Sequence, residues 1–379
     1  MNKEKLKINI VMGPFYPIPP VRGLAVEKRQ FAMAQEYAKA GHDVTMISRR
    51  FEGLPHREVK DGITHIRVPS FAQPKPGLLY RLLDLIYSML VAVYMPKADI
   101  TVTNSVSAPL ILPLSKAGKI AVSVGRYPKG QMGFYRRATR LHAASRFIGD
   151  VIKEQSPQVA GKVHVVNNAI SHDFAEAIEG VRSARASNIT YLGRISREKG
   201  IDILIKAFAD LSPRFPEWHL TLIGPFEIDR GGDGEGYLTE LKTLAASAGS
   251  RIHFAGPLYG GREIIARLRQ ADIFVYPSVA EKGEAFGIAP VEAMACGCAL
   301  VVSSLRCFED FVEPEGNALV FDHRSNAVNN LASSLKRLLR DEELRQRLGS
   351  AAMKTAENFT PATIAQHMLC DFNKLVADA

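Results

Sequence analysis

The chain has 379 residues, of which 46% are apolar and 23% are charged, so it is long enough to bury the cores of about two domains. Its apolar runs are too short to make a bilayer span the first interpretation, and the charged N-terminus differs from a signal peptide. The four cysteines lack paired CxxC spacing and His partners, which argues against zinc and disulfides and favours a reducing cytoplasm.

The positive charge belongs to the first half of the chain. Residues 1–185 contain 27 Lys and Arg against 14 Asp and Glu, a net charge of +13, whereas the remainder has 21 against 25. Such a basic half suits an anionic partner, for example a phospholipid surface or a phosphorylated acceptor. Nucleic acid is not expected, because the chain has neither a recognition motif nor a basic patch interleaved with aromatic residues.

Hydrophobic periodicity predicts alternating strands and helices in this basic half. The segment at its end, Ser171 to Asn188, is polar and lacks a long apolar run, as expected of a linker between domains. We expect strands at 8–12, 44–47, 63–68, 100–103, 120–124 and 163–168, and helices at 25–40, 78–95, 108–116 and after 145.

Three segments of the first half allow two interpretations each. The strongly apolar helix 78–95 is expected to be covered by the sheet, with membrane insertion as the alternative. The loop after strand 8–12 ends at Gly23, which either approaches a phosphate or only connects a strand to a helix. The loop 125–131 carries Arg126, Tyr127 and Lys129, which either contact an acceptor or lipid headgroups or form a solvated basic face.

The alternation restarts after the linker. Strands are expected at 189–192, 220–223, 252–255, 273–276, 300–303 and 318–321, and a last helix at 362–377, while the Gly-rich segment 230–236 is interpreted as a flexible connector. Two such series predict two doubly wound α/β domains with parallel sheets. A site is then expected at the carboxyl ends of the strands.

The loop after strand 189–192 contains two cations. Arg194 and Lys199 stand between a strand end and a helix start, where charge-assisted donors can clamp a diphosphate. The alternative is a polar loop with surface charges. The pattern therefore suggests an anion site without requiring one.

The second candidate motif is the acidic stretch from Glu284 to Glu292. It follows the buried strand 273–276, and helical geometry lets Glu292 point toward the same space as Glu284. The free amides at the helix start favour an anion between them. We expect this stretch to form one wall of a sugar-diphosphate pocket and the Arg194–Lys199 loop the opposite wall; the alternative is a helix with a solvated acid.

These motifs together resemble those of a known enzyme family. Gly-Arg-x-x-x-x-Lys-Gly at 193–200, the Pro-Ser turn at 277–278 and Glu-x-Phe-Gly at 284–287, with a second Glu eight positions after the first, are similar to those of retaining nucleotide-sugar glycosyltransferases of family 4. The resemblance implies the GT-B fold, with two Rossmann-like domains facing a central cleft. It places an acceptor-binding domain at 1–186, joined by the C-terminal helix 361–379, and a donor-binding domain at 187–360.

The resemblance also implies roles for individual residues. Arg194 and Lys199 would bind the donor diphosphate, Glu284 the hydroxyls of the donor sugar and Glu292 the ribose, with Arg194, Lys199 and Glu284 as the catalytic set. Further donor contacts are expected from Gly23, Phe254, Phe286, Gly287 and Ile288, and acceptor contacts from Asn104, Arg126, Tyr127 and Lys129. The family usually carries a His near the end of the strand 99–104, a position that either Thr103 or Asn104 takes in this chain. No metal and no cofactor is expected.

The implied activity is transfer of a hexose from a nucleotide-diphosphate sugar, UDP-linked rather than GDP-linked, to a glycan or lipid-linked acceptor. The products would be surface polysaccharide, lipopolysaccharide or glycolipid. Two alternatives are kept: a catalytically silent GT-B scaffold and a phospholipid glycosyltransferase. The expected location is the cytoplasm, with peripheral binding to the inner face of the cell membrane left open.

Overall fold

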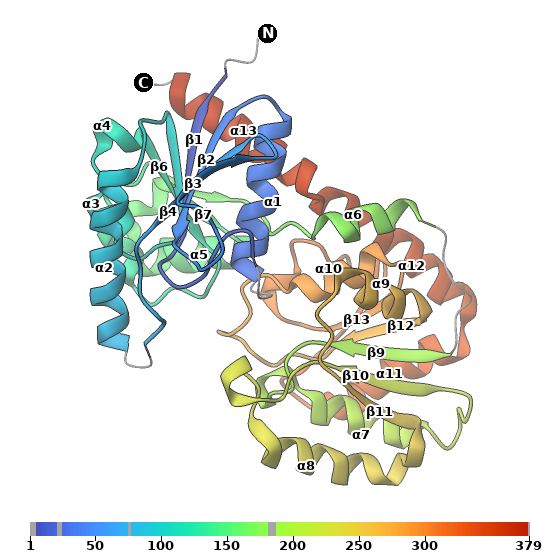
Figure 1. Cartoon of the computed structure of the whole chain (residues 1–379). Helices are drawn as coiled ribbons and strands as arrows, with labels where there is room; N and C mark the ends of the chain where they lie inside the picture. The colour runs from blue at the N-terminus through green and yellow to red at the C-terminus, as the bar shows by residue number, and fades with distance from the viewer. Residues whose placement is uncertain (1–4, 21–24, 75–76, 181–186, 378–379) are drawn as a thin grey trace. The chain divides into compact units, whose positions relative to one another are not determined.

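The computed structural model describes residues 5–20, 25–74, 77–180 and 187–377. The chain forms two compact units, Met1–Ala169 with Pro361–Ala379, and Ile170–Thr360 (Figure 1). Each unit is an α/β domain built on one sheet. The predicted alternation of strands and helices is therefore present in both halves of the chain.

The first unit contains an eight-stranded sheet in the order β3-β4-β2-β1-β5-β6-β7-β8. All neighbouring strands are parallel except β3 and β4, which form an antiparallel edge hairpin. The strands are β1 (Lys7–Val11), β2 (Asp43–Arg49), β3 (Arg57–Lys60), β4 (Ile63–Val68), β5 (Ile100–Thr103), β6 (Lys119–Val124), β7 (Arg140–Ala143) and β8 (Val163–Val165).

Helices cover both faces of this sheet (Figure 1). They are α1 (Ala25–Lys39), α2 (Gly77–Tyr94), α3 (Ala108–Ile111), α4 (Leu114–Ala117), α5 (Arg146–Gln155) and α13 (Pro361–Ala377). The single helix expected at 108–116 is wrong, because Leu112 is extended before Pro113, and a residue preceding proline is disfavoured in the helical region. The result is two one-turn helices, α3 and α4.

The expectation that the helix at 78–95 is covered by the sheet is also wrong. Helix α2 forms at this place, but only Asp84, Tyr87, Ser88 and Val91 are buried. Leu78 and Val93 are 82% and 70% exposed. By length and composition alone, α2 is the one helix among the described residues that could cross a membrane.

The second unit contains a six-stranded parallel sheet in the order β11-β10-β9-β12-β13-β14. Counted from its own first strand this is the order 3-2-1-4-5-6 of dinucleotide-binding folds. Its strands are β9 (Asn188–Leu192), β10 (His219–Ile223), β11 (Ile252–Gly256), β12 (Ile273–Tyr276), β13 (Ala299–Ser303) and β14 (Ala318–Phe321).

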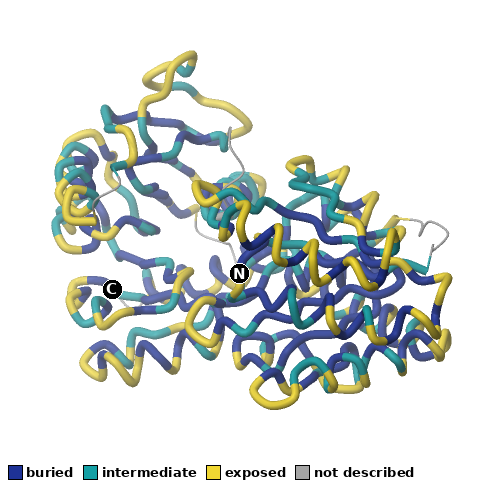
Figure 2. Tube along the Cα trace, turned by 90° about the horizontal axis from the view of Figure 1, so that it is seen from below, coloured by how far each residue is buried: buried dark blue, intermediate teal, exposed yellow. Residues whose placement is uncertain are grey.

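Two helical layers enclose the second sheet (Figure 1). One layer is α7 (Ile201–Leu211), α8 (Gly234–Ala245) and α11 (Ala327–Arg340); the other is α6 (His172–Glu179), α9 (Gly261–Gln270), α10 (Ile288–Ala295) and α12 (Glu342–Ala356). The strands between them lie in the buried interior (Figure 2). This burial explains their continuous apolar runs, which are typical of parallel sheets.

Helix α6 changes the expected boundary between the domains. The second unit begins at Ile170, not after residue 186. The segment interpreted as a linker contains α6, which buries Phe174 and Ala177 and packs against α9 and α10. Arg269 of α9 also donates to the Ala177 carbonyl at 3.0 Å. Two apolar residues one turn apart were thus enough to attach a polar segment to the second unit.

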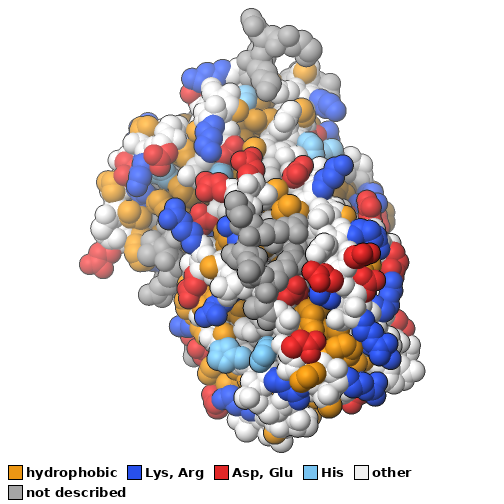
Figure 3. All heavy atoms as spheres, turned by 90° about the vertical axis from the view of Figure 1, so that its right-hand side faces the viewer, with side chains coloured by type: hydrophobic (Ala, Val, Ile, Leu, Met, Phe, Trp, Pro, Cys, Tyr) orange, Lys and Arg blue, Asp and Glu red, His pale blue; other side chains and the backbone are white. Residues whose placement is uncertain are grey.

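The charge difference between the two halves of the chain comes from the sequence and does not appear as a single-sign patch on the face in Figure 3. On the face drawn in Figure 3, basic and acidic side chains are interspersed and no large area carries a single sign. The excess of Lys and Arg is confined to residues 1–185. Any interaction with an anionic surface is therefore to be sought in the first unit.

Candidate functional site

The candidate site lies at the carboxyl ends of β9 and β12. These strands are neighbours at the point where the strand order of the second sheet reverses, the position at which doubly wound sheets bind ligands. The loop after β9 carries Arg194 and Lys199, and the loop after β12 carries Glu284. The fold alone thus brings together residues about ninety positions apart.

Lys199 and Glu284 form a buried ion pair. The Lys199 ammonium donates to Glu284 Oε1, and the two residues are 4% and 7% exposed. We expected them on opposite walls of a pocket, but they touch within one domain. In such a buried pair each group compensates in part for the lost hydration of the other.

Two hydroxyl groups complete the surroundings of Glu284. Tyr276 and Ser278 donate to its Oε1 at 2.9 and 3.3 Å. The Tyr276 ring stacks on Tyr191 with centroids 5.9 Å apart. Burial, reinforced by the Glu284 carboxylate, raises the pKa of Tyr276 well above its ordinary value, so its hydroxyl stays a donor. Glu284 is therefore held in one orientation by an ammonium and two hydroxyl groups.

Gly200 permits the close approach of the two loops. Its φ of +64° is in the left-handed region, and a Cβ atom would lie 2.2 Å from the Pro277 carbonyl oxygen. The loops are joined by the Val279 amide, which donates to the Glu198 carbonyl at 2.9 Å. The Lys-Gly pair of the motif thus has a physical reason: a side chain at position 200 would clash with the loop that carries Glu284.

Arg194 lies at the exposed side of the same loop. Its guanidinium donates to Glu198 Oε1 and to the Gly231 carbonyl, both at 2.8 Å. Glu198 also lies 4.0 Å from the Lys199 ammonium and so links the two cations. The segment 230–236 is not the free connector that we expected, because Asp233 in addition accepts from the Arg197 amide at 2.6 Å.

The other predicted donor residues of the second unit are spread over two elements. Phe286 and Gly287 are buried just before α10, Ile288 is its first residue, and Glu292 is half-buried on its second turn. Phe254 lies on the edge strand β11, with β10 and β9 between it and β12. The structure therefore brings Lys199 and Glu284 into contact, while Phe254 belongs to a separate part of the sheet edge.

The predicted acceptor residues lie in the first unit. Asn104 follows β5 and Arg126 follows β6, so both lie at the carboxyl ends of neighbouring strands. The Asn104 Oδ1 atom is buried without a hydrogen-bond partner. Tyr127 packs against Phe147 with ring centroids 6.0 Å apart, and Lys129 is exposed. Gly23 lies outside the described residues.

The first unit also contains a buried acid, Glu27, that no sequence motif predicted. Glu27, in the first turn of α1, is 8% exposed. Burial raises its pKa, opposed by a backbone hydrogen bond and by the charge of Arg126. Its position just after the loop 13–23, in the first turn of a helix, was the signal that could have identified it.

A second group that no motif predicted, His323, contacts the loop that carries Glu284. His323 is buried after β14, with Nε2 3.0 Å from Glu281 Oε1 and Nδ1 3.2 Å from Ser304 Oγ. Arg324 contacts the same Glu281 carboxylate at 2.9 Å. Glu281 lies three residues before Glu284, so these contacts restrain the loop. No motif spacing connects positions 281, 304 and 323, and only the sheet order brings them together.

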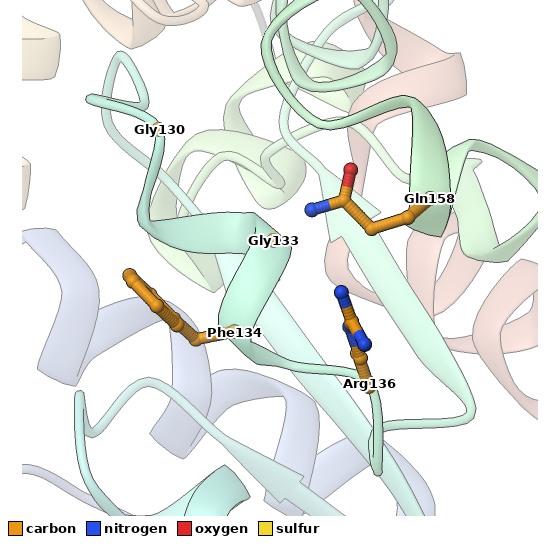
Figure 4. Close-up of a pocket in the computed structure, with 5 residues that line it drawn as sticks. All are labelled: Gly130, Gly133, Phe134, Arg136 and Gln158. Atoms are coloured by element: carbon orange, nitrogen blue, oxygen red, sulfur yellow. The ribbon is translucent and has the colours of Figure 1, made fainter.

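A small pocket of about 250 Å³ lies elsewhere, in the first unit (Figure 4). It is lined by Gly130, Gly133, Phe134, Arg136 and Gln158. It borders the predicted acceptor loop but includes none of Arg126, Tyr127 and Lys129. Within the described parts of the chain, no group of three or more His, Cys, Asp or Glu is placed to hold a metal ion.

Comparisons with known proteins show which family and which relatives the chain is similar to. Residues 179–355 match the family of glycosyl transferases group 1. Spore coat protein SA of Bacillus subtilis is 23% identical over 97% of this chain and all of the relative. A phosphatidyl-myo-inositol mannosyltransferase of Mycobacterium tuberculosis is 24% identical over 84% of this chain and 77% of the relative.

Solved structures show the same fold. A sucrose-phosphate synthase from Thermosynechococcus elongatus superposes with a TM-score of 0.75 at 19% identity, over 98% of this chain and 100% of that one. Anabaena HepE in complex with UDP and glucose superposes with a TM-score of 0.69 at 18% identity, over 97% and 99%.

The fold and the matched domain thus define the class of the protein. The predicted pair of doubly wound α/β domains is confirmed as the GT-B fold. The resemblance to GT-B glycosyltransferases is likewise confirmed. The chain is therefore a glycosyltransferase enzyme.

Proposed function

We propose that this enzyme transfers a hexose, with retention of configuration, from a UDP-sugar to a glycan or lipid-linked acceptor. The products are surface polysaccharide, lipopolysaccharide or glycolipid. The observation that carries the proposal is the buried Lys199–Glu284 pair beside Arg194 at the switch point of the second sheet. Two cations and a fixed carboxylate suit a sugar diphosphate, whose phosphates need donors and whose hydroxyls need acceptors.

The chemistry follows from where charge develops. The bond between the sugar C1 and the diphosphate oxygen breaks, a bond from C1 to the acceptor oxygen forms, and the acceptor proton passes to the departing diphosphate. Negative charge grows on the diphosphate as its bond to C1 breaks. Lys199 and Arg194 are therefore worth more in the transition state than in the bound substrate. Glu284, which accepts from three groups, positions the sugar and is not proposed as a nucleophile.

Donor and acceptor classes are supported by what similar proteins are named for. HepE was solved with UDP and glucose, and the mycobacterial relative is named for a phosphatidyl-inositol acceptor. We propose that Glu292 holds the ribose, that Phe254, Phe286, Gly287 and Ile288 add donor contacts, and that Asn104, Arg126, Tyr127 and Lys129 bind the acceptor. We further propose that no metal and no cofactor is needed, that nucleic acid is not a partner, and that the enzyme works in the cytoplasm or at the inner face of the membrane.

Turnover of the donor tests the proposal. Purified enzyme should release UDP from a UDP-sugar, with EDTA having no effect, and Arg194→Ala should lower kcat by about 100-fold or more, the cost of one preorganised donor. Unchanged turnover in Arg194→Ala would remove the assigned role. Folded protein that binds UDP but releases none with any donor would instead favour the silent scaffold.

Retention without a covalent intermediate can be tested separately. We expect no covalent sugar on Glu284, so intact mass spectrometry after incubation with a 2-fluoro sugar donor should show the unmodified chain. An adduct on Glu284 would show that the carboxylate is a nucleophile. A thermal-shift screen of UDP-sugars and GDP-sugars decides the base, since a ligand at 100 times its Kd adds about 2.7 kcal/mol of stability.

A further inference from the structure

Helix α2 presents a continuous apolar stripe to solvent. Leu78, Leu82, Leu85, Met89 and Val93 recur at intervals of three and four residues and are 36–82% exposed. Such spacing places all five on one face of the helix. A soluble monomer rarely exposes so many large aliphatic residues together, so this face is expected to have a partner.

The opposite face fastens α2 to its domain. The buried Asp84 carboxylate accepts from Ser105 Oγ at 3.0 Å and from the Ser107 amide at 2.7 Å. Ser88 lies 3.1 Å from the same Ser105 hydroxyl. A helix that left the domain to cross a bilayer would have to give up these buried hydrogen bonds. The stripe must therefore meet its partner while α2 stays in place.

Segments near α2 also expose large apolar side chains. Helix α3 packs beside α2, as Figure 1 shows, and leaves Leu110 exposed. The Arg137 guanidinium donates to the Leu110 carbonyl, and Tyr135 donates to the Val106 carbonyl at 3.0 Å, which joins the segment 131–137 to α3. That segment carries Phe134, 74% exposed, at the edge of the pocket in Figure 4.

Basic residues accompany this apolar surface. Residues 77–139 contain eight Lys and Arg against two Asp and Glu, a net charge of +6. Both acids are engaged within the domain: Asp84 is buried, and Asp99 accepts from the Lys7 amide at 2.7 Å. Arg81 and Arg136 are exposed, and Lys116 donates to the Ala92 and Val93 carbonyls at the end of α2. This combination of charge and apolar stripe suits an anionic lipid surface.

We propose that the exposed face of α2, extended by Leu110 and Phe134, is an interfacial membrane anchor for bilayers containing anionic phospholipid. The aliphatic stripe enters the boundary between headgroups and acyl chains, and Arg81, Arg136 and their basic neighbours pair with lipid phosphates. The helix lies in the plane of the surface and does not cross it. The inference rests on the proposed function only in placing the acceptor at the membrane.

Vesicle co-sedimentation tests the anchor without any sugar transfer. The enzyme should bind phosphatidylcholine vesicles that contain phosphatidylglycerol, and Leu82→Glu with Met89→Glu should lower the partition constant by at least about tenfold, because two aliphatic side chains leave the lipid. Arg81→Gln with Arg136→Gln should weaken binding to the anionic vesicles by about fivefold per residue and leave binding to pure phosphatidylcholine unchanged.

A matched control distinguishes binding through this face from non-specific binding by any exposed apolar side chain. Ile228 is 77% exposed on the second unit, and Ile228→Glu should leave vesicle binding unchanged. Equal loss in Ile228→Glu, or no loss in the α2 variant, would overturn the anchor. So would light scattering that shows a dimer which Leu82→Glu with Met89→Glu dissociates, since the face would then bind a second copy. Vesicle binding without UDP release would leave the anchor standing and remove the proposed activity.

Discussion

Lys199 and Glu284 pose a specific energetic problem for the second domain. Removing two charges from water costs several kcal/mol for each, and their attraction repays that cost only when the remaining hydrogen bonds are made. Tyr276 and Ser278 supply those bonds to Glu284. A pair kept at this cost is more simply explained by ligand binding than by stability.

This explanation predicts that stability and activity separate. Lys199→Met leaves the Glu284 carboxylate buried without its cation and should lower the free energy of unfolding by about 3 kcal/mol. The double variant Lys199→Met with Glu284→Leu should recover most of that loss, because apolar residues replace both charges. Transfer activity should stay lost in both variants. An activity assay and urea unfolding of the same proteins measure the two effects.

An exposed lysine on the helix that follows serves as the control. Lys206 pairs with Asp202 at 3.1 Å on the exposed side of α7. Lys206→Met should change neither quantity appreciably, because exposed pairs contribute little. Full activity in the double variant at Lys199 and Glu284 would show that the pair is structural only.

His323 gives a prediction about the loop itself. His323→Ala removes the contacts to Glu281 and Ser304 and should free the loop that carries Glu284. We expect the Kd for UDP to rise by about tenfold, the equivalent of one net hydrogen bond. Isothermal titration measures it, and His323→Gln, which can still donate to Glu281, should recover part of the affinity. An unchanged Kd in His323→Ala would show that the brace has no role in binding.

At the scale of elements, α13 is attached to the first unit by buried charge. The Asp371 carboxylate accepts from Arg140 Nε and lies 3.1 Å from His142 Nε2, and the Phe372 ring meets Tyr37 at 5.9 Å. Burial by itself raises the pKa of Asp371, but the hydrogen bonds from His142 and Arg140 outweigh it and lower the pKa to about 2. The helix is thus held by a carboxylate that must stay ionised.

Acid should therefore release α13 in a defined window. Asp371 takes up a proton more readily in the unfolded chain, so its contribution of about 2 kcal/mol is complete above pH 4 and is lost as the pH falls toward 2. Asp371→Asn should lower stability at pH 7 and flatten the acid limb of the first unit. Hydrogen exchange of α13 and β7 as a function of pH measures this loss of stability, with the exposed Asp229→Asn as control. An unaltered acid limb in Asp371→Asn would contradict the assignment.

At the scale of the whole molecule, the two sheets share one plan but carry different chemistry. The second sheet collects the Lys199–Glu284 pair and its brace, whereas the first carries the basic loops and the apolar α2 face. This division predicts where a nucleotide acts. The effect of UDP should be concentrated in the loops of the second unit.

Hydrogen exchange with UDP tests this division. Saturating UDP should protect residues 193–200 and 277–292 and leave α2 unchanged, because a bound ligand stabilises only the regions that close around it. Arg194→Ala should weaken that protection. Protection confined to the first unit would contradict a donor site on the second sheet.

Much of this arrangement could be predicted from the order of residues along the chain. Buried strands of Val, Ile and Leu alternating with amphipathic helices determine a doubly wound fold, because each apolar face must be covered. The same order places Arg194, Lys199 and Glu284 at the carboxyl ends of strands, where parallel sheets gather their loops. These are local consequences of periodicity and connectivity.

Other features depend on contacts between distant segments, which spacing does not encode. Only the tertiary structure joined Lys199 directly to Glu284, brought His323 and Ser304 to the Glu284 loop, and attached α6 to α9 and α10. It also left the stripe of α2 uncovered, although its sequence is that of a buried helix. Periodicity states that a helix has an apolar face; whether protein or lipid covers that face is decided by which elements the folded sheet leaves beside it.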